Sequence, residues 1–388
     1  MRVGMVAGET SGDLLAARVL QGLRTQHQDL LCEGIGGPAM VEQGFTAWHP
    51  IDRLSVFGYV DALKRLPGLI RTYRHVKQRW QTTPPDVFVG VDAPDFNLRL
   101  EASLRQAGVP TIQFVSPSIW AWRYERIHQI RAAVSHMLVL FPFEETLYRK
   151  EGIPVTYVGH PLAWEIPEVP DKNAARSRLG LPAEARVLAV LPGSRRSEIH
   201  LLADRFIQAA RALQQQDPAL HIVIPTVNAQ RHAELEAMLE RANLRHYKLL
   251  VPETREHDRP VAWDAMEASD AVLAASGTAT LEAALFKRPM VISYVLSPTM
   301  RRIMAWKSGQ KKPLVPWVGL PNILAREFIV PELLQEAATP GALAEAAWKA
   351  LTDTTYRQQL HEHYQQLHSA LKRDTGKLAA QAIMNQIQ

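Results

Sequence analysis

Short apolar runs alternate with amphipathic stretches along most of this 388-residue chain. Strands that are buried on both faces of a sheet are continuous apolar runs, and helices between them indicate parallel pairing. Such strands are predicted at residues 3–7, 86–91, 110–115, 136–140 and 154–158. The alternation therefore predicts an α/β fold built on a parallel sheet.

The alternation stops at residues 161–171, where three prolines indicate a connection between domains. It restarts with predicted strands at 186–191, 221–225, 271–274 and 289–294, and the chain is predicted to be all-helical from about residue 342. We therefore expect an N-terminal domain over residues 1–165 and a C-terminal domain over 166–388, with the final helices able to pack back on the first. Ligands usually bind in a cleft between two such domains.

The composition excludes several classes of protein. Apolar residues make up 47% of the chain and charged residues 21%, which is typical of globular proteins and not of disordered or fibrous ones. The single cysteine, Cys32, leaves no intramolecular disulfide and suits a reducing cytoplasm. We expect neither a membrane span nor a signal peptide, and no spacing typical of a metal site occurs.

The charge balance leaves the partner open. A net charge of +5 fits an anionic substrate, an anionic membrane surface or nucleic acid. The basic residues are scattered among other motifs instead of being gathered in a nucleic-acid-binding signature, so we expect no nucleic acid as a partner.

The first candidate loop, GETSGD at residues 8–13, follows the first predicted strand. Its glycines allow a sharp turn, and Ser11 or Asp13 could cap the next helix. A helix N-terminus after a strand can bind an anion, although this spacing is neither GxGxxG nor a P-loop. The acids Glu9 and Asp13 favour contact with sugar hydroxyls or proton transfer. The alternative is a tight turn with no further role.

Asp92 follows the strand at 86–91, at the strand end where open α/β sheets place ligand-binding residues. It is a candidate general base, which would require partial burial to raise its pKa. The nearby Asp95 is interpreted as an N-cap. In the next loop, Trp120 and Trp122 could line a ligand site or be buried in the core.

Two loops in the second half have the composition of phosphate-binding turns. In LPGSRRSE at 191–198, Ser194 and the following backbone N–H groups, together with the Arg195 guanidinium, suit a diphosphate. In ASGTATLE at 275–282, small residues allow close approach of a phosphate, and Glu282 could accept hydrogen bonds from a ribose. The small residues are Ser276, Gly277, Thr278 and Thr280. The pair of loops indicates a nucleotide site, with a surface arginine and a capping serine as the alternative.

Residues 63–80 combine apolar residues at helical spacing with six basic residues and no acid. This pattern is typical of a helix on a membrane surface and equally of a crossover helix whose apolar stripe faces the sheet. Pro67 is expected to interrupt or start the helix. The candidate membrane or acyl-chain contacts are Val56, Phe57, Lys64, Arg65, Leu66, Leu69 and Arg71.

These motifs together resemble the lipid-A-disaccharide synthase family, over nearly the whole chain and in the same order. The similar segments are VAGETSGD (6–13), DVFVGVDAPDFN (86–97), VSPSIWAWR (115–123), FPFE (141–144), YVGHP (157–161), LPGSR (191–195), ASGTATLE (275–282) and GLPNILA (319–325). The resemblance implies a GT-B architecture, in which two Rossmann-like domains with parallel sheets face a central cleft.

The resemblance also implies a reaction. A 2,3-diacylglucosamine unit passes from its UDP ester to 2,3-diacylglucosamine 1-phosphate, which gives a β-1,6-linked disaccharide 1-phosphate and UDP. The anomeric carbon inverts, so one displacement and one base suffice, and no cofactor is required. The acceptor and the membrane are assigned to the N-terminal domain and the UDP-sugar to the C-terminal domain.

The implied site combines the candidate loops. Asp92 is the candidate base, with Glu9 and Ser11 beside it, and Asn322 in GLPNILA matches a family residue that faces the cleft. The resemblance implies a cytoplasmic protein held peripherally at the cytoplasmic leaflet of the inner membrane of a Gram-negative bacterium, and a homodimer is possible. The alternatives are another UDP-sugar GT-B enzyme, such as a UDP-N-acetylglucosamine epimerase or the peptidoglycan N-acetylglucosamine transferase, and a nonenzymatic peripheral membrane protein.

Overall fold

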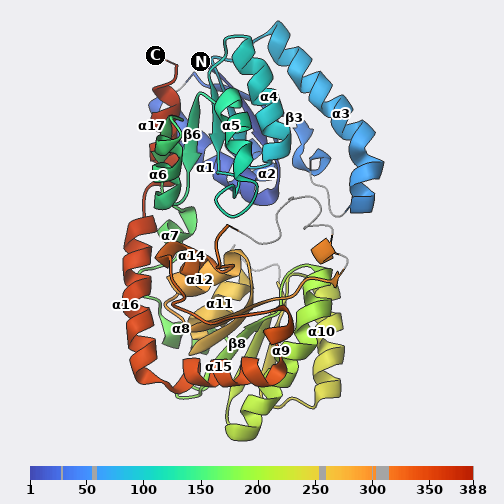
Figure 1. The fold of residues 1–388 in the computed structure, drawn as a ribbon, viewed down its shortest axis with the longest axis vertical. Coiled ribbons are helices and arrows are strands. Elements are labelled where there is room, and N and C mark those ends of the chain that lie inside the picture. Colours follow the sequence, from blue (N-terminus) through green and yellow to red (C-terminus); the bar gives the residue numbers. More distant parts are fainter. Residues whose placement is uncertain (28, 55–58, 253–258, 299, 303–313, 388) are drawn as a thin grey trace. The chain divides into compact units, whose positions relative to one another are not determined.

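The computed structural model describes residues 1–27, 29–54, 59–252, 259–298, 300–302 and 314–387 (Figure 1). The chain forms two compact units. Unit 1 comprises Met1–Trp164 and Ala370–Gln388, and unit 2 comprises Glu165–Ser369. Each unit contains one sheet whose strands all pair in parallel, so the prediction of two parallel-sheet α/β domains is confirmed.

The sheet of unit 1 has seven strands in the order β3-β2-β1-β4-β5-β6-β7. The predicted strands are β1 (Arg2–Ala7), β4 (Val87–Val91), β5 (Thr111–Phe114), β6 (His136–Val139) and β7 (Val155–Tyr157). The apolar pattern does not reveal β2 (Leu31–Gly36) and β3 (Thr46–Pro50). Glu33 and two glycines interrupt β2, and β3 is a half-exposed edge strand.

Helices lie on both faces of this sheet (Figure 1). The helices are α1 (Thr10–Gln26), α2 (Pro38–Glu42), α3 (Tyr59–Thr82), α4 (Pro94–Gln106), α5 (Ile127–Ala133), α6 (Pro142–Lys150) and α17 (Thr375–Met384). α1 packs against α2 and α17, whereas α4 packs against α3 and α5. α3 runs through Pro67 as one helix, so the predicted interruption there is wrong.

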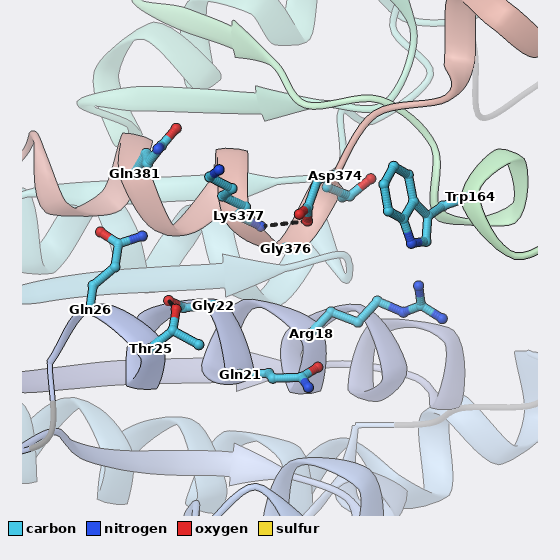
Figure 2. Close-up of a pocket in the computed structure, with 11 residues that line it drawn as sticks. Arg18, Gln21, Gly22, Thr25, Gln26, Trp164, Asp374, Gly376, Lys377 and Gln381 are labelled. Carbon is cyan, nitrogen blue, oxygen red and sulfur yellow. Dashed lines mark hydrogen bonds between the residues drawn. The ribbon is translucent and has the colours of Figure 1, made fainter.

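The C-terminal helix α17 packs closely on α1. Figure 2 shows Gly22 of α1 near Gly376 of α17. A Cβ atom built on Gly22 would lie 2.6 Å from the carbonyl oxygen of Gly376. Two glycines therefore allow the two helix backbones to approach each other, and the last residues of the chain complete unit 1.

The sheet of unit 2 has six strands in the order β10-β9-β8-β11-β12-β13. The predicted strands are β8 (Val187–Leu191), β9 (His221–Pro225), β11 (Ala271–Ala275) and β12 (Met290–Tyr294), and those that the pattern does not reveal are β10 (Tyr247–Leu250) and β13 (Glu332–Leu334). The helices used below are α9 (Arg196–Gln216), α11 (Val261–Ala268), α12 (Thr278–Leu285), α14 (Leu320–Ala325), α15 (Pro340–Thr352) and α16 (Thr354–Leu371). α15, α16 and α17 confirm the helical C-terminal part.

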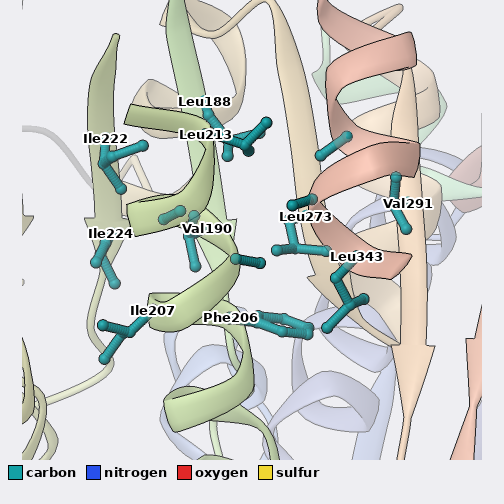
Figure 3. Close-up of a cluster of buried hydrophobic side chains, with 14 of the residues drawn as sticks. Leu188, Val190, Phe206, Ile207, Leu213, Ile222, Ile224, Leu273, Val291 and Leu343 are labelled. Carbon is teal, nitrogen blue, oxygen red and sulfur yellow. The ribbon is translucent and has the colours of Figure 1, made fainter. Parts of the chain in front are cut away.

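The core of unit 2 lies where α9 and α15 pack against the sheet (Figure 3). Phe206 from α9 and Leu343 from α15 are fully buried with Leu273 of β11. Because apolar burial is the main stabilising term in folding, this layer fixes the strands whose ends carry the candidate loops.

Candidate functional site

Asp92 lies in a tight turn at the carboxyl end of β4. Asp92 and Ala93 both have left-handed backbone angles, with φ of 56° and 41°. The N–H of Asp92 donates to the carbonyl of Phe114 at 2.9 Å, so β5 holds the turn. Two consecutive left-handed residues other than glycine are unusual, and such strain is concentrated at functional sites.

The GETSGD loop and the Asp92 turn form one local structure. Ala7 of β1 pairs with Val91 of β4, so both loops leave the same edge of the sheet on neighbouring strands. A Cβ on Gly8 would overlap the side chain of Ala93, and a Cβ on Gly12 would lie 3.6 Å from Cβ of Asp92. Gly8 therefore leaves the space that the Asp92 turn occupies, whereas a methyl group at Gly12 would be in ordinary van der Waals contact with Asp92.

The carboxyl group of Asp92 is partly buried, and this burial raises its pKa, while a hydrogen bond from the N–H of Ala93 opposes the shift. Glu9 and Ser11 are exposed at the start of α1. Asp13 differs from its predicted role. Its buried carboxylate accepts from the N–H groups of Gly37, Ala39 and Met40, so it caps α2 and not α1.

Another buried acid of unit 1, Glu144, lies in the first turn of α6, shortly after β6. Glu144 accepts from the indole N–H of Trp120 and from the N–H of Phe141, both at 3.2 Å. Burial raises the pKa of Glu144 to about 7. Trp120 is half-buried and meets the ring of Phe143 edge-on. The sequence analysis did not assign Glu144 a role, although an acid directly after the apolar run of Phe141–Phe143 is a usable signal.

In unit 2, Arg195 lies just before α9, at the carboxyl end of β8. Its side chain is 76% exposed and forms an ion pair of 3.5 Å with Glu198. The carboxylate of Glu198 also accepts from the N–H groups of Ser194 and Arg195, at 3.0 and 3.2 Å. The backbone N–H groups that were expected to face a diphosphate are thus bound to Glu198, and the guanidinium remains exposed.

The ASGTATLE loop joins β11, the neighbour of β8, to α12. Gly277 has a φ of 135° with open space where a side chain would point, and Thr278 is exposed beside it. The hydroxyl of Ser276 donates to the carbonyl of Val318, and that of Thr280 to the carbonyl of Gly277. The start of α12 is therefore open at Gly277 and Thr278, whereas the N–H of Thr280 donates to the carbonyl of Gly277.

Glu282 lies one turn into α12. It accepts from the indole N–H of Trp263 at 3.0 Å, and burial raises its pKa. Trp263 comes from α11. Because 19 residues separate it from Glu282, no local pattern predicts this contact.

Asn322 differs from its expected placement at a ligand. It is fully buried, and its amide nitrogen donates to the carbonyl of Val330 and to Glu332. Its amide oxygen accepts from the N–H of Val330. The structure therefore uses Asn322 to fix the connection from α14 to β13.

The two halves of α3 differ in burial, and the structure confirms the crossover interpretation for the second half. Val76 and Trp80 are fully buried, so the second half of the helix packs on the sheet. Leu66 and Ile70 are 46% and 41% exposed, Leu69 is half-buried and Arg71 is exposed. Lys64 and Arg65 lie in the first half of α3, whereas Val56 and Phe57 lie outside the described residues.

Among the described residues, no group of His, Cys, Asp and Glu is arranged to hold a metal ion. In the same part of the chain, no helix is long and apolar enough to cross a membrane.

Comparison with known proteins identifies the family. A sequence model described as lipid-A-disaccharide synthetase matches residues 3–384. The chain belongs to this family. It is 66% identical over 385 residues to the lipid-A-disaccharide synthase of Bordetella petrii, covering 99% of this chain and 98% of the relative. It is 47% identical to that of Chromobacterium violaceum, with coverage of 99% and 97%. The chain is therefore a glycosyltransferase of lipid A disaccharide synthesis.

Solved structures agree in fold. A glycosyltransferase involved in lipopolysaccharide biosynthesis aligns with a TM-score of 0.56 at 15% identity, over 99% of this chain and 98% of that one. The UDP-GlcNAc 2-epimerase from Neisseria meningitidis, solved with UDP-GlcNAc, aligns with a TM-score of 0.61 at 12% identity, over 99% of both chains. These likenesses show the two Rossmann-like domains of the GT-B class.

Proposed function

We propose that this lipid-A-disaccharide synthetase family member transfers 2,3-diacylglucosamine from its UDP ester to 2,3-diacylglucosamine 1-phosphate, with inversion. The observation that carries the proposal is Asp92, a partly buried carboxyl with a raised pKa in a rigid turn. A base with a pKa raised toward the working pH is suited to accept a proton from a sugar hydroxyl.

The proposed reaction is a single displacement. The Asp92 carboxylate accepts the proton of the acceptor's 6-hydroxyl as that oxygen bonds to the anomeric carbon of the donor. The bond from that carbon to the diphosphate oxygen breaks, and UDP leaves with the electron pair. The products are the β-1,6 disaccharide 1-phosphate and UDP. Glu9 and Ser11, exposed near the Asp92 turn, are proposed to contact the acceptor.

Unit 2 is proposed to bind the donor. The exposed Arg195 guanidinium and the open start of α12 supply positive charge for the diphosphate that leaves. Glu282 is proposed to hold the ribose, and Asn322 to act indirectly by fixing the α14 connection. The proposed phosphate contacts are Ser194, Ser276, Gly277, Thr278 and Thr280.

The first half of α3 is proposed to dock on the cytoplasmic leaflet of the inner membrane, with the protein otherwise in the cytoplasm. Exposed Leu66 and Ile70 supply apolar contact and Arg71 meets anionic lipid. From the sequence alone, Lys64, Arg65, Val56 and Phe57 are predicted to contact the membrane as well, and a homodimer remains a prediction. Charge reversal of Lys64, Arg65 and Arg71 in pairs should reduce sedimentation with anionic vesicles. Unchanged sedimentation would leave α3 as a core helix only.

The test of the reaction is UDP release from UDP-2,3-diacylglucosamine in EDTA, with and without the acceptor. Release that requires the acceptor, with a disaccharide product, is the expected result. Release without acceptor would instead indicate an activity like that of an epimerase or hydrolase.

Two variants test the assigned residues. Asp92→Asn should fold normally and lose about 10²–10⁴-fold in kcat, because the base is neutralised while its shape is kept.

Arg195→Ala should weaken the binding of UDP, which calorimetry measures. Equal affinity would remove Arg195 from the diphosphate site.

A further inference from the structure

Two buried side-chain amides hold the carbonyl group of Asp92. Nδ2 of Asn97 lies 2.8 Å and Nε2 of Gln113 lies 3.1 Å from this oxygen. Asn97 comes from α4 and Gln113 from β5, and neither is exposed. A strained turn persists only where its surroundings determine it, and here two separate elements donate to the same carbonyl.

The other ends of these amides lack partners. The side-chain oxygens of Asn97 and Gln113 have no hydrogen-bond partner among the described residues, and the same holds for both carboxyl oxygens of Glu101. Glu101 lies one helical turn after Asn97 and is fully buried. Both pack on Gly90 of β4, where a Cβ would overlap Glu101 and lie 2.9 Å from Cγ of Asn97.

The burial of Glu101 decides its protonation. No positive charge in the described part of the chain compensates the carboxyl, so burial raises its pKa well above the ordinary value. The neutral carboxyl carries an O–H that can donate to a neighbouring amide oxygen, as an ionised one cannot. Buried polar atoms without partners destabilise a fold, so apolar residues would serve this layer better if packing were its only role.

We propose that Asn97 and Gln113 are positioning residues that hold the Asp92 turn for catalysis, and that Glu101, packed with Asn97 against Gly90, supports Asn97. This inference rests on the proposed role of Asp92 as the base. The three residues do not contact the substrates. They fix the direction in which the Asp92 carboxyl leaves the end of β4.

The main test is Gln113→Met, which keeps the length of the side chain. It removes the unpartnered oxygen and the amide that donates to the carbonyls of Asp92, Phe114 and Val115. We expect kcat to fall about tenfold or more through misplacement of the base. Both KM values should stay within about twofold, and the unfolding temperature should not fall. If Gln113 had a purely structural role, the unfolding temperature would fall and kcat would stay the same. An unchanged kcat would therefore overturn the proposal.

Glu101 is tested by a pair of variants. Glu101→Gln keeps the shape and a neutral donor, so kcat should stay within about twofold of the parent. Glu101→Leu keeps a similar side-chain volume but has no hydrogen-bonding group, so it should lower kcat as Gln113→Met does. Equal losses in both variants would overturn the assignment of a neutral donor.

Asn97 has a matched control in the same turn of α4. Asn97→Asp replaces the donor to Asp92 by an acceptor and should lower kcat at unchanged UDP affinity. Asp95→Asn replaces a carboxylate by an amide at a surface ion pair with Arg126 and should leave kcat unchanged.

The variant Asp92→Asn separates the failure of the positioning role from the failure of the proposed base. If it is inactive while Gln113→Met and Asn97→Asp keep full kcat, only the positioning role fails, whereas an active Asp92→Asn overturns both.

Discussion

The raised pKa of Asp92 comes from the burial of its carboxyl group and not from a charged neighbour among the described residues. The resolved influences on its pKa are burial, which raises it, and one backbone hydrogen bond, which lowers it. Because no ion pair with Asp92 occurs among the described residues, its carboxylate is available to accept a substrate proton.

The raised pKa of Asp92 predicts the acidic limb of the pH profile. Because the base acts in its ionised form, kcat/KM should fall as the pH drops through a value above the usual 3.8 of an aspartate. A pH–rate series measures this limb. An acidic limb at or below 3.8 would contradict the assignment, and Asp95→Asn should leave the limb in place.

Glu144 predicts a dependence of stability on pH. Its folded pKa of about 7 exceeds the ordinary 4.5, so the folded protein holds a proton that the unfolded chain has released between these values. The stability that comes from the neutral form is complete below 4.5 and is lost as the pH rises through about 7.

Glu144→Gln tests this sign. The free energy of unfolding of the parent minus that of the variant should shrink between pH 5 and 8, by at most about 3 kcal/mol. Glu145→Gln, which removes one surface ion pair with Arg149, is the control in urea titrations. A difference that grows with pH would contradict the burial argument.

At the scale of elements, the contact between α1 and α17 depends on glycine. The backbones approach so closely at Gly22 and Gly376 that neither position has room for a methyl group (Figure 2). Helix propensity alone favours alanine at a helical glycine, and here the tertiary contact opposes that preference.

Gly22→Ala is expected to destabilise unit 1 by about 1–3 kcal/mol through overpacking. Gly341→Ala is the matched control, because nothing lies within 4 Å of the new methyl group in α15. That variant should be stabilised by about 0.4–1 kcal/mol. Thermal unfolding of both proteins measures the two effects, and equal shifts of the same sign would refute the packing argument.

At the scale of the whole molecule, the two units differ in how the chain builds them. Unit 2 is continuous from Glu165 to Ser369, whereas unit 1 needs both ends of the chain. Ala379, Ala380 and Ile383 of α17 are buried there.

Removal of residues 370–388 should therefore lower the stability of unit 1 and leave that of unit 2 nearly unchanged. Hydrogen exchange resolves this locally. Amides of β1 and α1 should exchange faster in the shortened chain, and amides of β8 and β11 should not. Faster exchange in both units would show that the tail supports the whole molecule.

The sequence alone determined the architecture and the order of the loops, because strands buried on both faces must be continuous apolar runs. This is why β4 and β8 were predictable, while the edge strands β3 and β10, exposed on one side, were not. It also determined that Asp92 follows a central strand.

Only the tertiary structure decided the partners of the polar groups. Asp13 caps a helix that begins 25 residues later, Glu198 binds the N–H groups expected to face a phosphate, and Asn322 is buried. Asn97 and Glu101 share the buried face of α4 with Leu104, a helical spacing that could have been noticed. Their packing beneath the Asp92 turn could not be predicted, because contacts between buried groups depend on which distant segments the fold brings together.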